Sequence, residues 1–391
     1  MAYEIDTPSR ILMGPGPSVV PPRVYRALMM PTVGHMDPYY FKVMDEVQAM
    51  MRQVFRTNNE LTLIISGTGM SGMETALANL LEAGDEIVVC NGGVFAGRMP
   101  EIARRCGATV REIKLPWGRG VTAEEIETAL KEKPAKVVAL VHGETSTGVM
   151  QTGIAEIAKL CHNHGALLLV DTVASLAGTE FRTDEWDVDV VYAGSQKCLG
   201  VPPGLAPITF GKRAVEAIAK RKQKVQSWYL DMTLVRDYWN EKRVYHHTGP
   251  INMTYAMHAG LSLIVEEGLD ARVARHARMA QALYAGVEAM GLGLFVKNAA
   301  ERCPTVTTVL IPDGADDAQV RKTLLEQHNL EIGGGLGDLK GKGWRVGLMG
   351  EGARPNPVLL CLAALGGILR KQGCRVEPGR GVEAAAAVIN G

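Results

Sequence analysis

Two short apolar runs, each ending at a polar turn, constrain the fold of this chain more than any other feature. Leu167–Val170 is unbroken and stops at Asp171, and the mainly apolar run Val188–Tyr192 leads through AGSQ to Lys197. Runs of this length are typical of strands buried on both faces of a parallel sheet. Open α/β sheets bind ligands beyond the carboxyl ends of their strands, so we expect Asp171 and Lys197 to face one crevice.

An aspartate and a lysine in this order favour one cofactor, pyridoxal phosphate (PLP). PLP forms a Schiff base with a lysine, and its pyridine nitrogen needs a carboxylate partner to stay protonated. A protonated ring can accept the electrons released when an amino acid loses its α-proton. Taken singly, a turn aspartate and a solvated lysine are the simpler explanations. The two residues together predict a PLP site.

A glycine loop earlier in the chain predicts a phosphate site. The apolar run Leu61–Ile65 is followed by SGTGMSGMETALANLLEAGD, typical of a strand, a loop and a helix that ends at Gly84. Glycines let the backbone approach a phosphate, and a helix N-terminus offers free N–H groups. We therefore expect a phosphate beside Thr68, Gly69 and Met70.

The same loop leaves a second interpretation open. Gly67, Gly69 and Gly72 form the pattern G-x-G-x-x-G, which after a strand indicates a dinucleotide-binding enzyme such as an NAD(P)-dependent oxidoreductase. That enzyme needs an acidic residue near the end of the next strand. The next predicted strand, Glu86–Cys90, ends at Asn91, so this interpretation is the less favoured one.

Three further residues are candidates on weaker signals. Phe95 follows a strand end, where a ring could stack on a flat cofactor, although, taken singly, a core phenylalanine is the better explanation. Thr145 lies in the polar loop HGETSTG as a hydroxyl donor, or as part of an ordinary turn. Arg345 stands inside the apolar strand WRVGLMG, either as an edge residue reaching solvent or as a bidentate carboxylate clamp.

Composition narrows the functional classes. The 391 residues carry 42 basic and 42 acidic side chains, which gives no reason to expect nucleic acid or an anionic membrane as a partner. Apolar runs are far shorter than the ~18 residues of a membrane-spanning helix. The polar start MAYEIDTPSR is unlike a signal peptide. The seven cysteines form no C-x-x-C pair, which favours reduced thiols in the cytoplasm, and histidine spacing predicts no metal site.

Strand and helix patterns alternate through residue 210, which predicts an α/β fold with a doubly wound, mainly parallel sheet. We expect an N-terminal arm at 1–20, a cofactor-binding large domain at 21–260 and a smaller α+β domain at 261–391. Helices are predicted over Pro38–Phe55, Arg213–Lys224 and Ala256–Ala289.

Assembled in order, these motifs resemble the class V aminotransferases of PLP fold type I, and most of all the alanine–glyoxylate and serine–pyruvate (or serine–glyoxylate) group. The motifs are MGPGPS, VGHMDP, SGTGMSGMETAL, NGGVFAGRM, HGETSTGV, LLLVDTVASL, GSQKCLG, YHHTGP and GGGLGDLKGKGWRVGLMG. The likeness runs almost end to end and weakens beyond Gly350. Phe95 stands where some relatives have Trp, and Met70 where some have His.

The resemblance implies a role for each matched residue. Lys197 would be the Schiff-base lysine, Asp171 the pyridinium partner and Arg345 the clamp for the substrate carboxylate. The remaining cofactor contacts would be Thr68, Gly69, Met70 and Gln196 at the phosphate, Thr145 near the ring oxygen, Phe95 and Val173 on the two ring faces, and Tyr245 and Thr248 reaching the phosphate of the neighbouring subunit. A homodimer with shared active sites is therefore implied.

The activity implied is transfer of an amino group from a small amino acid to glyoxylate or pyruvate, in two half-reactions. Alanine, serine and ureidoglycine donors share these motifs, so a ureidoglycine–glyoxylate aminotransferase stays an alternative. Cysteine desulfurases share the fold but have His before the lysine and a mobile loop cysteine, where this chain has Gln196 and no cysteine in 333–341. A binding module without catalysis leaves the combination of Lys, Asp, Arg and phosphate loop unexplained.

Overall fold

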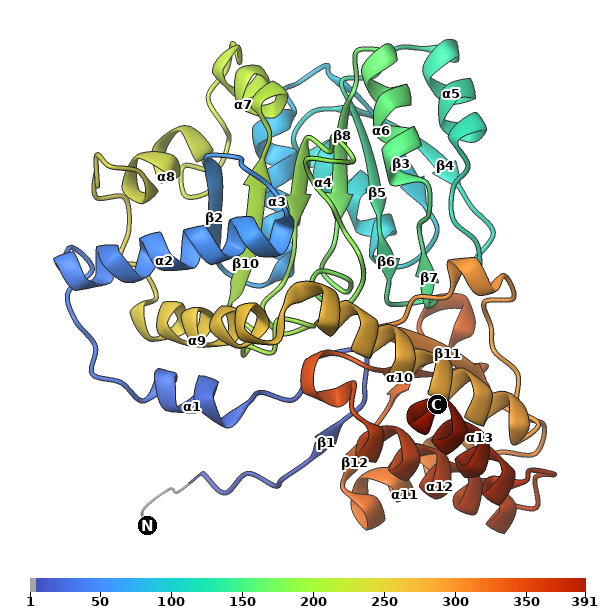
Figure 1. The fold of residues 1–391 in the computed structure, drawn as a ribbon. Coiled ribbons are helices and arrows are strands. Elements are labelled where there is room, and N and C mark those ends of the chain that lie inside the picture. The colour runs from blue at the N-terminus through green and yellow to red at the C-terminus, as the bar shows by residue number, and fades with distance from the viewer. Residues whose placement is uncertain (1–4) are drawn as a thin grey trace.

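The computed structural model describes residues 5–391, and a seven-stranded sheet forms its centre (Figure 1). The strand order is β2-β10-β9-β8-β5-β3-β4. The bounds are β2 Leu61–Ser66, β3 Glu86–Asn91, β4 Thr109–Lys114, β5 Val137–Val141, β8 Leu167–Asp171, β9 Val190–Tyr192 and β10 Leu205–Phe210. The central strands β5, β8 and β9 are almost fully buried, as their unbroken apolar runs predict.

The sheet departs from the predicted pattern at one edge. β3, β4, β5, β8 and β9 run parallel, but β10 runs antiparallel to both of its neighbours, β9 and β2. A sheet that is mainly parallel is therefore confirmed. The apolar pattern of Leu205–Phe210 contains no information on direction, because it shows burial on both faces and nothing about the connection before it.

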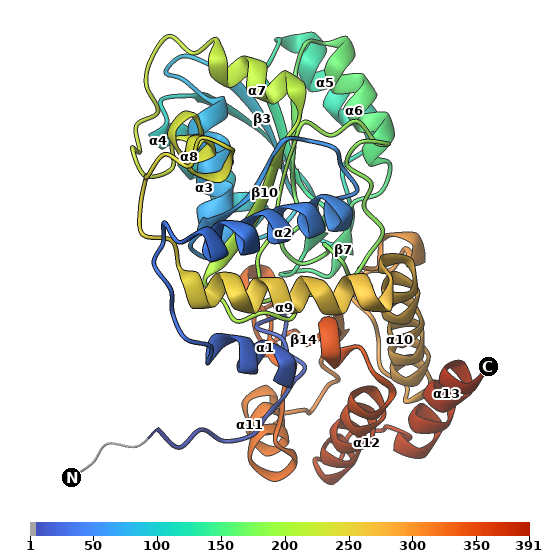
Figure 2. The same cartoon turned by 60° about the vertical axis from the view of Figure 1, so that its left-hand side comes forward.

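Helices cover both faces of the sheet, which makes it doubly wound (Figure 2). α3 (Gly69–Leu80) and α4 (Met99–Arg105) pack together on one face, and α5 (Ala123–Glu132) packs against α6 (Ile154–Asn163) on the other. A capping box holds the start of α5, where Thr122 accepts from the Glu125 N–H and Glu125 accepts from the Thr122 N–H.

Several predicted helices have different ends in the structure. α2 spans Pro38–Phe55 as predicted. α3 ends at Leu80 instead of Gly84, because the turn that follows is closed by Asp85, whose carboxylate accepts from the Glu82 N–H. α7 is shorter than predicted, at Lys212–Ala219. The long helix splits at Gly268, which has a φ of 82°, into α9 (Ile251–Glu267) and α10 (Leu269–Ala289).

A second hydrophobic core lies under the C-terminal elements, in the lower part of Figure 1. A three-stranded antiparallel sheet, β11-β14-β13, packs with α10, α11, α12 and α13. The bounds are β11 Val306–Leu310, β12 Leu330–Glu331, β13 Gly333–Gly334, β14 Gly343–Gly347, α11 Asp317–His328, α12 Pro355–Lys371 and α13 Pro378–Asn390. The N-terminal segment joins this core, since β1 (Ile11–Leu12) pairs with β12 and Met13 is buried there. The division at residues 20 and 260 stays a prediction.

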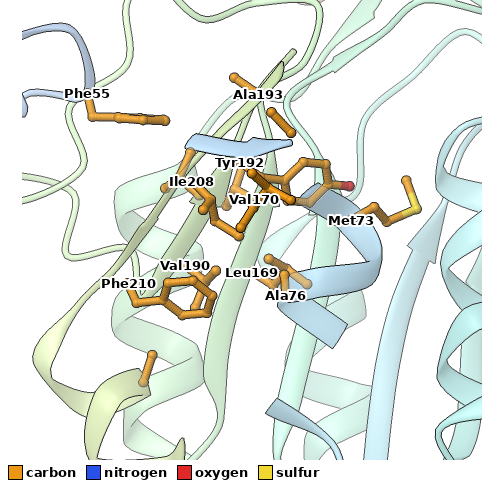
Figure 3. Close-up of a cluster of buried hydrophobic side chains, with 14 of the residues drawn as sticks. Phe55, Met73, Ala76, Leu169, Val170, Val190, Tyr192, Ala193, Ile208 and Phe210 are labelled. Carbon is orange, nitrogen blue, oxygen red and sulfur yellow. The ribbon is translucent and has the colours of Figure 1, made fainter. Parts of the chain in front are cut away.

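In the larger core, α3 packs against β9 and β10 of the sheet. Figure 3 shows side chains of β8, β9 and β10, among them Val170, Tyr192 and Ile208, together with Met73 and Ala76 of α3. Gly72 permits this close approach, because a β-carbon there would stand 3.1 Å from the Tyr192 side chain. The packing fixes the N-terminus of α3 beside the ends of β8 and β9. No helix among residues 5–391 has an apolar stretch long enough to cross a bilayer.

Candidate active site

Asp171 and Lys197 open onto one cleft of about 580 Å³. Asp171 is the last residue of β8, and its register partner Tyr192 ends the neighbouring parallel strand β9, five residues before Lys197. Both charged side chains line the cleft, although each is less than a tenth exposed. The strand patterns therefore predicted this juxtaposition correctly.

The carboxylate of Asp171 is fixed by two donors. The Tyr192 hydroxyl and the Val173 N–H each donate to one carboxylate oxygen, both at 2.7 Å. Burial raises the pKa of the Asp171 carboxyl to about 7, although both hydrogen bonds lower it. A cationic group inside the cleft would stabilise the ionised form of this carboxylate.

The Lys197 amine is a weaker base than an ordinary lysine. Its Nζ donates to the Pro15 carbonyl oxygen, and burial lowers the pKa of the amine to about 8. A lysine in this range has a substantial neutral fraction near neutral pH, which nucleophilic attack on a carbonyl requires. The MGPGPS motif thus contacts the lysine directly, a relation that the sequence did not reveal.

One end of the cleft is built to hold an anion. Thr68 precedes the first turn of α3, whose leading N–H groups have no partner within the helix. Gly69 lies against Val173, and a β-carbon at Gly69 would stand 3.0 Å from that side chain. Gln196 also lines the cleft, and the NH₂ group of its side-chain amide can donate to an anion. Met70 also lines this end.

Phe95 and Thr145 lie on the cleft wall, as predicted. Arg345 lies just behind that wall on β14, where it is 8% exposed. Its Nη1 donates to the Thr145 carbonyl oxygen at 3.2 Å and its Nε to the Gly334 carbonyl oxygen at 2.8 Å. Burial lowers the pKa of this guanidinium.

Tyr245 and Thr248, unlike the other predicted cofactor contacts, do not reach this cleft. Both are exposed, and they lie in the segment between α8 (Met232–Trp239) and α9. The ring of Tyr245 stacks obliquely on His35, with centroids 4.9 Å apart. Their predicted role belongs to a neighbouring subunit, and that role stays a prediction.

Sequence reasoning missed three residues of the site. Tyr192 hydrogen-bonds Asp171, Glu144 is a buried acid behind Phe95, and Arg98 lines the cleft with its guanidinium 4.8 Å from the Phe95 ring centroid. Tyr192 ends the apolar run Val188–Tyr192, and Glu144 lies in the polar loop HGETSTG. Their signal was a polar group within a buried strand end or βα loop, which always needs a partner.

The cleft fits PLP on its own chemistry. It offers an amine for the aldehyde, a buried carboxylate for the ring nitrogen, and a helix N-terminus with the Gln196 amide for the phosphate end. In the described part of the chain no group of three or more His, Cys, Asp or Glu side chains could hold a metal ion.

Comparisons with known proteins agree with this chemistry. The family model "Aminotransferase class-V" matches residues 23–337. The alanine–glyoxylate aminotransferase of Drosophila melanogaster is 43% identical over 92% of this chain and 92% of its own. The crystal structure of ureidoglycine–glyoxylate aminotransferase from Bacillus subtilis superposes with a TM-score of 0.97 at 41% identity, covering 100% of both chains. That of alanine–glyoxylate aminotransferase from Nostoc sp. has a TM-score of 0.92 at 46% identity, covering 95% of this chain and 98% of the other.

The topology also disfavours the dinucleotide interpretation. The loop with Gly67, Gly69 and Gly72 follows β2, which lies at the sheet edge and pairs only with the antiparallel β10. A dinucleotide-binding glycine loop instead follows a central strand with parallel neighbours. The chain belongs to the class V aminotransferases, and it is a PLP-dependent transaminase of fold type I.

Proposed function

We propose that this transaminase transfers the amino group of a small amino acid, alanine or serine, to glyoxylate or pyruvate in a two-half reaction. Named relatives at about 40% identity over most of the chain use glyoxylate, which supports this acceptor. The observation that carries the proposal is the single cleft lined by Lys197 and Asp171, with Arg345 directly behind its wall at Thr145.

The proposal gives each of these side chains a role. Lys197 holds the cofactor and, once released, moves the proton between the substrate α-carbon and the cofactor carbon as general base and acid. Asp171 keeps the ring nitrogen protonated. When bound, PLP supplies an electron sink for the α-carbanion charge. Arg345 binds the α-carboxylate of donor and acceptor in turn.

The position of Arg98 affects which amino donors have to be tested. A transaminase for aspartate or glutamate needs a second cation for the distal carboxylate, and the motifs supplied only Arg345. The structure places a second guanidinium, that of Arg98, at the cleft. It stacks on Phe95 and donates to the Met70 sulfur at 3.2 Å. Dicarboxylate donors therefore belong in the substrate test.

A grid of amino donors against 2-oxo acid acceptors tests the proposal. Alanine, serine, ureidoglycine, aspartate and glutamate are each paired with glyoxylate, pyruvate and 2-oxoglutarate. We expect alanine or serine with glyoxylate to give the highest kcat/KM, with parallel-line kinetics. Ureidoglycine as the fastest donor would establish the alternative activity, which the 40% identity to the Bacillus subtilis transaminase over 98% of this chain supports. Glutamate with 2-oxoglutarate as the fastest pair would contradict both.

We also propose a cytoplasmic homodimer with shared active sites. Large apolar side chains are exposed on α1 (Pro22–Leu28), the α1–α2 connection, the start of α2, α8 and the segments on either side of α8. These segments lie on the left in Figure 1. This apolar face comprises Tyr25, Met29, Met30, Met36, Tyr39, Trp228, Tyr229, Leu234, Val244 and Tyr245. A second copy of the chain covering this face would bring Tyr245 and Thr248 toward its partner's cleft. The seven cysteines, all free and buried, agree with a reducing compartment.

Subunit complementation tests the shared site. Lys197→Ala chains lack the lysine, and Tyr245→Ala/Thr248→Ala chains lack the two residues predicted to cross the interface. In a mixed dimer one site has both sets intact. We expect mixing the two variants after mild dissociation to produce activity above the sum of the separate proteins. Activity equal to that sum, with mixed dimers present by mass spectrometry, would show that each site is complete within one chain.

A further inference from the structure

The buried acid Glu144 joins two loops of the active site. It is 4% exposed, in the short strand β6 (Gly143–Glu144) directly after β5. Its Oε1 accepts from the Ser146 N–H at 3.0 Å and from the Ser146 hydroxyl at 2.5 Å. Its Oε2 accepts from the Ala96 N–H at 3.0 Å, and the Phe95 N–H points to Oε1 at 3.4 Å.

Glu144 and Ser146 together bind three consecutive backbone N–H groups of the loop after β3. The Ser146 hydroxyl oxygen accepts from the Val94 N–H at 2.9 Å, and Glu144 takes the next two. The chain at Gly93 passes so close that a β-carbon would stand 2.5 Å from the Glu144 carboxyl carbon and 2.6 Å from the Ser146 hydroxyl. The loop that carries Phe95 is therefore fastened to the loop that carries Thr145.

The connection extends to the substrate clamp. Arg345 donates to the carbonyl oxygen of Thr145, which lies between Glu144 and Ser146 in the chain. The segment from Glu144 to Ser146 therefore contacts both the loop of Phe95, which follows β3, and Arg345, which lies on β14. No other acid of the described chain contacts both loops through these groups.

We propose that Glu144 is a positioning residue of the transaminase, whose carboxylate holds the Phe95 loop and the Thr145–Arg345 contact in register. The proposal rests on the proposed function, in which Arg345 binds the substrate carboxylate, and on the cofactor contact that the family resemblance implies for Phe95. Glu144 acts through these residues and does not touch the reacting atoms. Its charge also affects the site electrostatically, raising the pKa of both Asp171 and Lys197.

Glu144→Gln tests the proposal, because the amide keeps the shape but replaces one acceptor oxygen with an NH₂ group. That group faces an N–H donor of the loop, so one buried bond is lost. We expect PLP affinity, measured by absorbance titration, to fall by roughly 10- to 100-fold, and both Michaelis constants to rise together. The pH midpoint of the visible absorbance of bound cofactor should move lower, because a negative charge near Lys197 has been removed.

Asp189→Asn is the matched control. Asp189 is equally buried and accepts from the Leu168 N–H at 2.8 Å, but it lies at the opposite end of the strands from the cleft. We expect Asp189→Asn to lower thermal stability while PLP affinity, the spectral pH midpoint and both Michaelis constants stay unchanged. A Glu144→Gln protein that behaves like this control would overturn the proposal.

Ser146→Ala keeps the proposal testable if the Glu144 variant does not fold. It removes the bond to Val94 and one donor to Glu144, so we expect smaller changes in the same quantities. Unchanged PLP affinity and Michaelis constants in Ser146→Ala would count against the proposal. A wild-type protein that does not bind PLP at Lys197 would refute the proposed function itself, whereas normal wild-type binding with unaffected variants refutes only the role of Glu144.

Discussion

The cleft around Asp171 and the apolar face around Tyr245 have opposite physical characters. In the cleft, the Asp171 carboxylate and the Lys197 amine are buried, and both are held by hydrogen bonds within one chain. On the face, large side chains such as Met29 and Tyr245 are 83% and 56% exposed. Apolar surface of this kind usually marks an interaction site. This difference supports the proposal that a second copy of the chain covers the apolar face.

Removing the cleft's acid should have the largest effect. In Asp171→Asn the amide cannot keep a proton on the ring nitrogen, so turnover should fall by about 10²- to 10³-fold while PLP stays bound, as for other preorganised electrostatic contacts. Steady-state kinetics on PLP-saturated protein measure this. Asp189→Asn, equally buried but remote, should keep its turnover. Wild-type turnover in Asp171→Asn with PLP bound would show that Asp171 is not the partner of the ring nitrogen.

A charge on the apolar face should weaken the proposed dimer. Met29→Glu places a carboxylate where a second copy is expected, and an uncompensated buried charge costs about 3 kcal/mol or more. We therefore expect the dimer dissociation constant to rise by about 100-fold, measured by analytical ultracentrifugation. Gln327→Glu on the exposed side of α11 is the control and should leave assembly unchanged. A monomeric wild-type protein with full activity would contradict the account of this face.

Arg345 connects the cleft to the second core, and its loss should have an intermediate effect. Arg345→Ala should raise the Michaelis constants of donor and acceptor together by roughly 10- to 100-fold, the range for a hydrogen bond to a charged group. Arg321→Ala serves as the control, because Arg321 lies near the same Gly334 but pairs with Asp317 on the surface. If only one Michaelis constant rose, the shared clamp would be wrong.

The smallest predicted change concerns the Tyr192 hydroxyl. Its hydrogen bond lowers the pKa of Asp171, which burial holds at about 7. Tyr192→Phe should therefore raise that pKa, so that PLP affinity falls off at a higher pH as the solution is acidified. The loss of one bond to a charged group corresponds to about 1.5–3 kcal/mol at most. A titration of PLP binding against pH measures the shift, and a shift to lower pH would contradict the assignment.

The sequence predicted the cleft better than it predicted the contacts around the cleft. Asp171 and Lys197 were found because apolar runs identify buried strands and the chemistry lies at their ends. Tyr192 and Glu144 were missed because a buried hydrogen bond joins segments far apart in the chain and leaves no periodic pattern. The antiparallel direction of β10 was missed for a related reason, since burial alone does not show which way a strand runs.

The sequence also predicted the ends of several helices incorrectly. The break at Gly268 was missed because the apolar pattern continues across it from α9 to α10, while the local backbone, with a φ of 82°, turns the chain into the second core. Tyr245 and Thr248 were assigned through the resemblance alone. Nothing in their own sequence pattern, which is a loop rich in His and Gly, predicts a role in another subunit's site.

Chemical trapping of the cofactor on the chain tests the central claim most directly, namely that Lys197 in the Asp171 cleft holds PLP. The purified protein is incubated with PLP, reduced with borohydride, digested and mapped by mass spectrometry. We predict a pyridoxyl group on Lys197 alone, and none in the Lys197→Ala variant under the same conditions. A label on a different lysine, or a colourless protein that cannot be reconstituted with PLP, would contradict the account.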